Sequence, residues 1–216
     1  MNTPNKLTPT SQQMMEYRQM MAEEKIDIEK VNAFKEKYDT YNRIVEVDGK
    51  FGIKDAMGTT LVPAEYDYAG PAFEDYYRNS VVAVSKNGKM ALVSPDGKGT
   101  PVTGFIYDNI EFDGLYYQLH KDGKVGLATS RGDVVIPVDM DGLDTCFGSL
   151  VSYTKDEKFG FAMVYSDLFT ETIFDSGEIL DGGDLQVTKD GKIGYINDKG
   201  QFTIDPDESY FSIDIY

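Results

Sequence analysis

One short motif recurs five times along this chain and constrains its fold more than any other feature. The motif is a lysine followed by an apolar residue and a small residue, and its lysines are Lys50, Lys89, Lys124, Lys158 and Lys192. Each occurrence marks one copy of a longer repeat. Successive lysines are 39, 35, 34 and 34 residues apart. Self-similarity at a period of about 20–50 residues is typical of repeat architectures. Residues 42–216 are therefore predicted to form one array of five similar units.

Two turn signals lie in each copy. Directly before the lysine stand Asp48-Gly49, Asn87-Gly88, Asp122-Gly123 and Asp190-Gly191. Such pairs favour a type I′ hairpin turn, because both central residues of that turn need φ > 0. Copy four has Asp156-Glu157, and since Glu resists this geometry we predict a different or longer turn there. The second turn is expected eight residues after the lysine, at Gly58, Gly97, Gly132 and Gly200, with Ser166 in copy four.

Two turns separate three strands, so the predicted fold is all-β, with five tandem three-stranded β-meander repeats. Units that bury their apolar faces only against neighbours must stack. The array then forms either a propeller-like toroid or an open β-solenoid, and closure is favoured because it removes exposed strand edges. The small residue of the motif is Gly in four copies but Ala91 in copy two. We therefore expect it to allow close approach of a ring or backbone from the adjacent copy.

After the third predicted strand comes an aromatic–Asp column, formed by Tyr66-Asp67, Tyr107-Asp108 and Phe174-Asp175, with Met140-Asp141 at the same place in copy three. Together with the lysine motif, this column resembles the bacterial WG-repeat family, also called KWG repeats, over about four-fifths of the chain. The tryptophan of that pattern is replaced in every copy, by Phe51, Met90, Val125, Phe159 and Ile193. The resemblance implies a β-repeat array used for binding, and it implies no catalytic residues.

Residues 1–41 differ from the rest and are predicted to form an N-terminal helical arm, which leaves 42–216 as the repeat domain. Thr8 to Ser11 offer helix-capping side chains before the helix-forming run SQQMMEYRQMMAEEK. The segment DIEKVNAFKEKY then places apolar residues on one helical stripe. We expect this stripe to pack against the neighbouring repeats.

The net charge of −16 limits the classes of partner. Phosphates of nucleic acid and anionic lipid headgroups are repelled by such a chain, so neither nucleic acid nor membrane is expected as a partner. An unidentified protein or peptide, basic in charge, is the predicted partner. No signal-peptide pattern is visible and only one cysteine is present, which together favour a cytoplasmic location.

Residues suited to catalysis or metal binding are few. His120 is the only histidine, and its place near a hairpin tip predicts a solvated side chain. Cys146 is expected to be a small buried apolar residue. Asp139, Asp141 and Asp144 suggest calcium, but Asp141 belongs to the repeated column, whose carboxylates are more simply explained as caps of turn amides. The chain is therefore predicted not to be an enzyme and to need no cofactor.

The predicted function is a non-catalytic binding module, acting in protein–protein interaction through an acidic or aromatic surface. Tyr76, Tyr77 and Tyr116 are the candidate exposed anchors, since Tyr is favoured at interfaces; the alternative is that they fill gaps between repeats. Nine lysines cluster at the first hairpin tips, which leaves the remaining surface strongly acidic. The alternative function is a carbohydrate-binding repeat protein of an exported or surface form.

Overall fold

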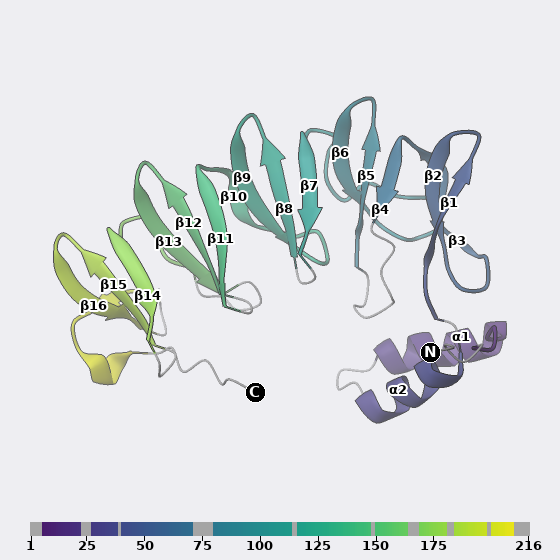
Figure 1. Ribbon diagram of the computed structural model, residues 1–216, viewed down its shortest axis with the longest axis horizontal. Coiled ribbons are helices and arrows are strands. Elements are labelled where there is room, and N and C mark those ends of the chain that lie inside the picture. Colours follow the sequence, from purple (N-terminus) through teal and green to yellow (C-terminus); the bar gives the residue numbers. More distant parts are fainter. Residues whose placement is uncertain are drawn as a thin grey trace, which may run out of the picture. The chain divides into compact units, whose positions relative to one another are not determined.

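The computed structural model describes residues 6–22, 27–38, 40–70, 80–113, 116–147, 150–163, 169–180, 184–197 and 200–209. Within these ranges two α-helices precede residue 41 and seventeen strands follow it (Figure 1). The all-β fold behind a helical arm is therefore confirmed. Neither helix in the described part of the chain is long and apolar enough to cross a membrane.

The chain divides into two compact units, Met1–Asp113 with Ser130–Asp133, and Gly114–Thr129 with Val134–Tyr216. The first holds α1 (Ser11–Ala22), α2 (Ile28–Lys37), β1 (Arg43–Val47), β2 (Lys50–Lys54), β3 (Thr60–Tyr66), β4 (Tyr68–Gly70), β5 (Val82–Lys86), β6 (Lys89–Val93) and β7 (Asn109–Phe112). The division between an arm and one repeat domain stays a prediction, as does the choice between toroid and solenoid.

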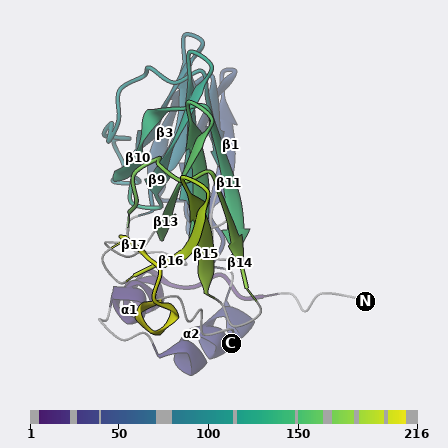
Figure 2. The same cartoon turned by 90° about the vertical axis from the view of Figure 1, so that its left-hand side faces the viewer.

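The second unit holds the remaining strands: β8 (Tyr116–Lys121), β9 (Lys124–Thr129), β10 (Val134–Met140), β11 (Gly142–Phe147), β12 (Leu150–Lys155), β13 (Lys158–Met163), β14 (Ser176–Ile179), β15 (Leu185–Lys189), β16 (Lys192–Ile196) and β17 (Phe202–Thr203). The short 3-10 helix η1 (Pro206–Glu208) follows. The last sheet runs β14-β15-β16-β17, and its strands lie side by side in Figure 2.

Every first hairpin of the five copies has a two-residue turn, including copy four. The predicted Asp-Gly and Asn-Gly turns have positive φ at both residues. In copy four, Asp156 has φ 51° and Glu157 has φ 63°, so the prediction of a different turn there was wrong. The reason is the register, because β12 and β13 pair without a break up to Lys155 opposite Lys158 and leave room for two residues only. Pairing of the strands overrides the reluctance of Glu to adopt this conformation.

The sheets after the first differ from a plain three-stranded meander in one respect that sequence reasoning missed. A further strand follows the aromatic–Asp column, at β4, β7, β11 and β14. Three of these pair antiparallel with the first strand of the next copy, in β4/β5, β11/β12 and β14/β15. The column therefore sits at the point where the chain leaves one sheet and enters the next. In copies two and four the described part of the predicted third strand consists of isolated bridges.

The small residue after each Lys–apolar pair does allow close approach, but the approaching atoms belong to the same copy. A Cβ at Gly126 would lie 2.6 Å from the carbonyl oxygen of Ile136. The cause is a bulge, because β10 pairs at Ile136 and next at Met140, while β9 advances only from Leu127 to Val125. Gly52 and Gly194 likewise face the backbone of their own third strand, while Gly160 faces the ring of Tyr153. The expectation of a neighbour from the adjacent copy was therefore wrong.

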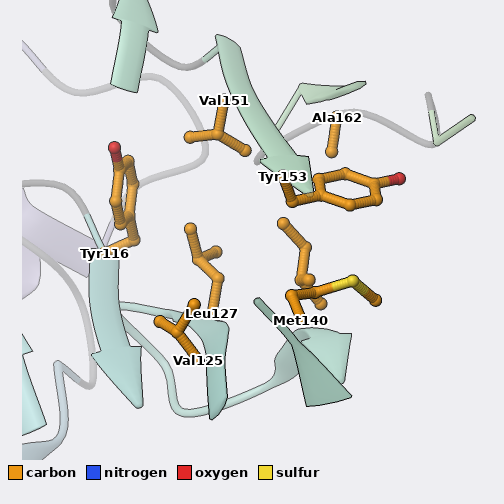
Figure 3. Close-up of a cluster of buried hydrophobic side chains, with 8 residues drawn as sticks. Tyr116, Val125, Leu127, Met140, Val151, Tyr153 and Ala162 are labelled. Atoms are coloured by element: carbon orange, nitrogen blue, oxygen red, sulfur yellow. The ribbon is translucent and has the colours of Figure 1, made fainter. Parts of the chain in front are cut away.

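The buried core is made of clusters that join neighbouring sheets within one unit. In the second unit, Tyr116, Val125, Leu127, Ile136 and Met140 of copy three meet Val151, Tyr153 and Ala162 of copy four (Figure 3). In the first unit, the arm packs as expected. Met14, Tyr17 and Val31 form its core, and Met57, from the second turn of copy one, packs against them.

Candidate functional site

The repeated lysine and the aspartate of the column form an ion pair in each of copies one to four. The pairs are Lys50–Asp67, Lys89–Asp108, Lys124–Asp141 and Lys158–Asp175. The second carboxylate oxygen of Asp67 also accepts a hydrogen bond from the Asn87 N–H, in the hairpin turn of the next copy. Asp141 and Asp175 accept from Asp156 and Gly191 in the same way. These aspartates therefore connect each hairpin to the next, which is a structural role.

The hydrogen bond from Lys50, followed by the one from the Asn87 amide, holds the pKa of the Asp67 carboxyl below its usual range. The equivalent lysine and amide lower the pKa of Asp141 and of Asp175. Two more ion pairs join the lysine before a turn to the bulge of the preceding copy, Lys86–Glu65 at 3.7 Å and Lys155–Asp139 at 2.7 Å. Six of the nine hairpin-tip lysines are thus matched by carboxylates. The matching acids are the column aspartates and two carboxylates of the preceding copy, none of which adjoins its lysine in the sequence.

The calcium site suggested by the sequence is not supported by the positions of its three aspartates. Asp139 and Asp141 are each paired with a lysine ammonium, and Asp144 is exposed on β11. Within the described residues, no group of three or more metal-ligating side chains gathers anywhere.

His120 lies on β8, where its side chain is half-buried and its Nε2 atom is buried, in contrast to the solvated tip residue that was predicted. The cause is its position inside the hairpin, since it pairs with Val125 one step before the turn. Cys146 belongs to β11, and its side chain is outside the described part.

The predicted aromatic anchors are not found together at a surface. Tyr76 and Tyr77 lie outside the described residues. Tyr116 is 0% exposed and packs against Val125, Leu127 and Val151, so it was wrongly predicted to be exposed. Its position on β8 directs it into the layer between copies three and four. The alternative interpretation, that this tyrosine fills a gap between repeats, is the one that the structure supports.

A groove of about 540 Å³ lies at this same junction of copies three and four. Ile136 and Met140 of β10, Tyr153 of β12, and Phe169 and Ile173 of the segment after β13 give it an apolar lining. The charged side chains among its lining residues are Lys155 and Glu171. Ligand sites of proteins are commonly apolar hollows with a few polar groups at their edge. This groove is the candidate functional site, and no sequence signal used above pointed to it.

Two side chains of the groove, Lys155 and Tyr153, have raised pKa values. Asp139 raises the pKa of Lys155, mainly through their hydrogen bond. Burial raises the pKa of the Tyr153 hydroxyl, which donates a hydrogen bond to the carbonyl oxygen of Thr170. A general acid or base works best with a pKa near the operating pH. The ordinary pKa values of Lys and Tyr already lie far above neutral pH, and both shifts move these two groups further from it.

Fold and groove together define a protein of tandem antiparallel β-repeats. Residues 51–89 match the model of the WG containing repeat family, which confirms the resemblance over that stretch. No curated protein matches the chain. Among solved structures, Kluyveromyces lactis Hsv2 is 11% identical, with 76% of this chain and 59% of that chain covered and a TM-score of 0.33. A structure described as the eukaryotic initiation factor is 12% identical, with 76% and 50% covered and a TM-score of 0.37.

This chain thus spans between half and three fifths of the length of those two proteins. Similarities as weak as these carry no inference about function. The repeat family and the fold suggest a binding module.

Proposed function

We propose that this protein is a non-catalytic binding module that holds a protein or peptide segment in the groove between copies three and four. The observation that carries the proposal is the groove itself, an open apolar hollow beside an ion pair on an otherwise acidic chain. Apolar burial supplies affinity in such sites, and the few polar groups set orientation.

The acidity of the chain favours a basic partner. Because six tip lysines are already matched by carboxylates, they offer little free positive charge, and the net −16 is carried by the remaining acids. Such a surface speeds the encounter with a basic segment. Nucleic acid and anionic membrane are not expected to bind.

Selection from a displayed random peptide library, with the full chain immobilised, tests this proposal. We expect saturable binders that are rich in Lys and Arg. Their association rate should fall as salt rises, since exposed charges are screened beyond about 8–10 Å near physiological ionic strength. A glycan array run in parallel tests the carbohydrate alternative. Saturable glycan binding without any selected peptide would overturn the proposal.

A further inference from the structure

The groove has an internal counterpart in the first unit, at the junction of copies one and two. The two junctions can be aligned residue by residue. The hydroxyl oxygen of Thr170 accepts a hydrogen bond from the Phe161 N–H, and that of Thr103 accepts one from the Leu92 N–H. Phe161 and Leu92 each stand three residues after the repeated lysine. The same threonine hydrogen bond therefore anchors the segment that lines each junction.

The alignment shows which side chains differ. Met140 precedes the column aspartate of copy three, where Tyr66 precedes that of copy one. Thr172 stands two residues before Phe174, where Phe105 stands two residues before Tyr107. Both rings of the first junction are thus replaced by smaller side chains in the second, while Tyr153 stands where the first junction has Val84.

In the first junction these rings form a stack. The Tyr66 and Phe105 centroids are 6.2 Å apart with an interplanar angle of 18°, and the Lys86 ammonium lies 5.8 Å from the Tyr66 ring centroid. In the second junction the cation is retained, because Lys155 stands where Lys86 does, and it keeps its acid, Asp139 in place of Glu65. The second junction therefore has the cation and its carboxylate without this stacked pair beside them.

The two junctions also differ in charge. Glu171 occupies the position of Gly104 and is exposed at the groove. It adds a carboxylate at a place where the first junction has no side chain. A ligand with a cation next to its apolar part would find a partner there.

We infer that the groove binds an aromatic side chain of a partner peptide, next to a Lys or Arg that pairs with Glu171. The partner's ring takes the place that Phe105 occupies in the first junction, over Met140, with Lys155 at the position from which Lys86 faces the Tyr66 ring. Aromatic rings attract ammonium groups at their faces, and methionine sulfur makes favourable contacts with rings. This inference rests on the proposed function and names the ligand class of the same groove.

The test uses the dipeptide amide N-acetyl-Phe-Arg-amide as probe, with ¹³C-methyl methionine NMR of the full chain as readout. We expect the Met140 methyl signal to shift and saturate. N-acetyl-Leu-Arg-amide and N-acetyl-Phe-Glu-amide should bind more weakly. Glu171→Gln should weaken the Phe-Arg probe about two- to fivefold, as expected for one exposed charge pair.

Thr172→Phe fills the groove with the residue that the first junction uses, and it should abolish the shift of Met140. Thr172→Ser is the matched control and should leave the shift intact. Urea unfolding of both variants shows whether they are folded. If Thr172→Phe is unfolded, the Glu171→Gln variant, which is changed at an exposed position, takes its place in the test. Equal binding of the Leu and Phe probes, or a Met140 signal that responds to a sugar and not to the peptides, would overturn the inference.

The peptides selected from the library separate this inference from the broader proposal. If those peptides bind Thr172→Phe as tightly as the parent chain, a binding module exists but its site is not this groove. If selection yields no peptide, the proposed function itself fails.

Discussion

Gly160 and Tyr153 are predicted to be energetically coupled, because the ring of Tyr153 lies against the place where a Cβ of residue 160 would be. That Cβ would be 2.4 Å from Cε2 and 2.8 Å from Cζ of the ring. The ring cannot swing away easily, since it is buried and its hydroxyl is bonded to the Thr170 carbonyl. Gly160→Ala should therefore destabilise the protein by about 1–3 kcal/mol through overpacking.

In copy two, the residue that faces the small residue of the motif is not a tyrosine. Val84 stands opposite Ala91, in the same register in which Tyr153 stands opposite Gly160. Tyr153→Val alone should cost about 2–4 kcal/mol, because it leaves a cavity and removes a hydrogen bond. In that background Gly160→Ala should cost almost nothing, since the ring is gone and Ala restricts the unfolded chain. The expected coupling energy is then about 1–3 kcal/mol.

The assay is urea unfolding of the four proteins of this cycle, followed by circular dichroism and tyrosine fluorescence together, so that coincidence of the two transitions can be checked. A matched control is Gly194→Ala combined with Val187→Ala, because the Cβ at Gly194 would meet the Thr203 carbonyl oxygen and the Phe202 ring, both of β17, and not the side chain of Val187 on β15. No rescue is expected in the control. If Gly160→Ala cost as much in the Tyr153→Val background as in the parent chain, the ring would not be the reason for the glycine.

The remaining predictions concern other backbone positions, one carboxylate and the fold as a whole. Gly194→Ala alone should destabilise by about 1–3 kcal/mol, measured by urea unfolding, since backbone must move; an unchanged midpoint contradicts this. Glu157→Gly should stabilise by about 0.5–1 kcal/mol by removing a strained φ, and a loss of stability would show that the turn is not strained. The lowered pKa of Asp141 means that its contribution is present above the unfolded pKa of about 3.9 and is lost as pH falls through the folded value. Asp141→Asn should therefore flatten the acid limb of the stability–pH curve, and an unaltered limb refutes that. Far-UV circular dichroism should be mostly β with a small helical part, and a helix-dominated spectrum would contradict the fold.

Local chemistry was enough to predict the repeated units, the positions of the hairpins and the helices before residue 41. Asn-Gly and Asp-Gly pairs favour one turn type, and the lysine motif marks each copy, so these features can be found without knowing which segments meet in space. The column aspartates were also rightly interpreted as structural, because a carboxylate that recurs at the same position in several copies is explained more simply by a contact common to those copies than by a single functional site.

Features that depend on neighbours distant in sequence emerged only from the folded chain. The turn at Glu157 follows from the pairing of β12 with β13, which no local preference of Glu reveals. The repeated lysines find their acids in the column, and Lys155 finds Asp139 in the preceding copy. Tyr116 is buried because copy four packs over it. The groove is lined by Met140 and Thr172, at the positions where Tyr66 and Phe105 stack in the first unit. Whether two such side chains face each other is set by packing between copies, and for that reason the candidate site could not be predicted from the sequence.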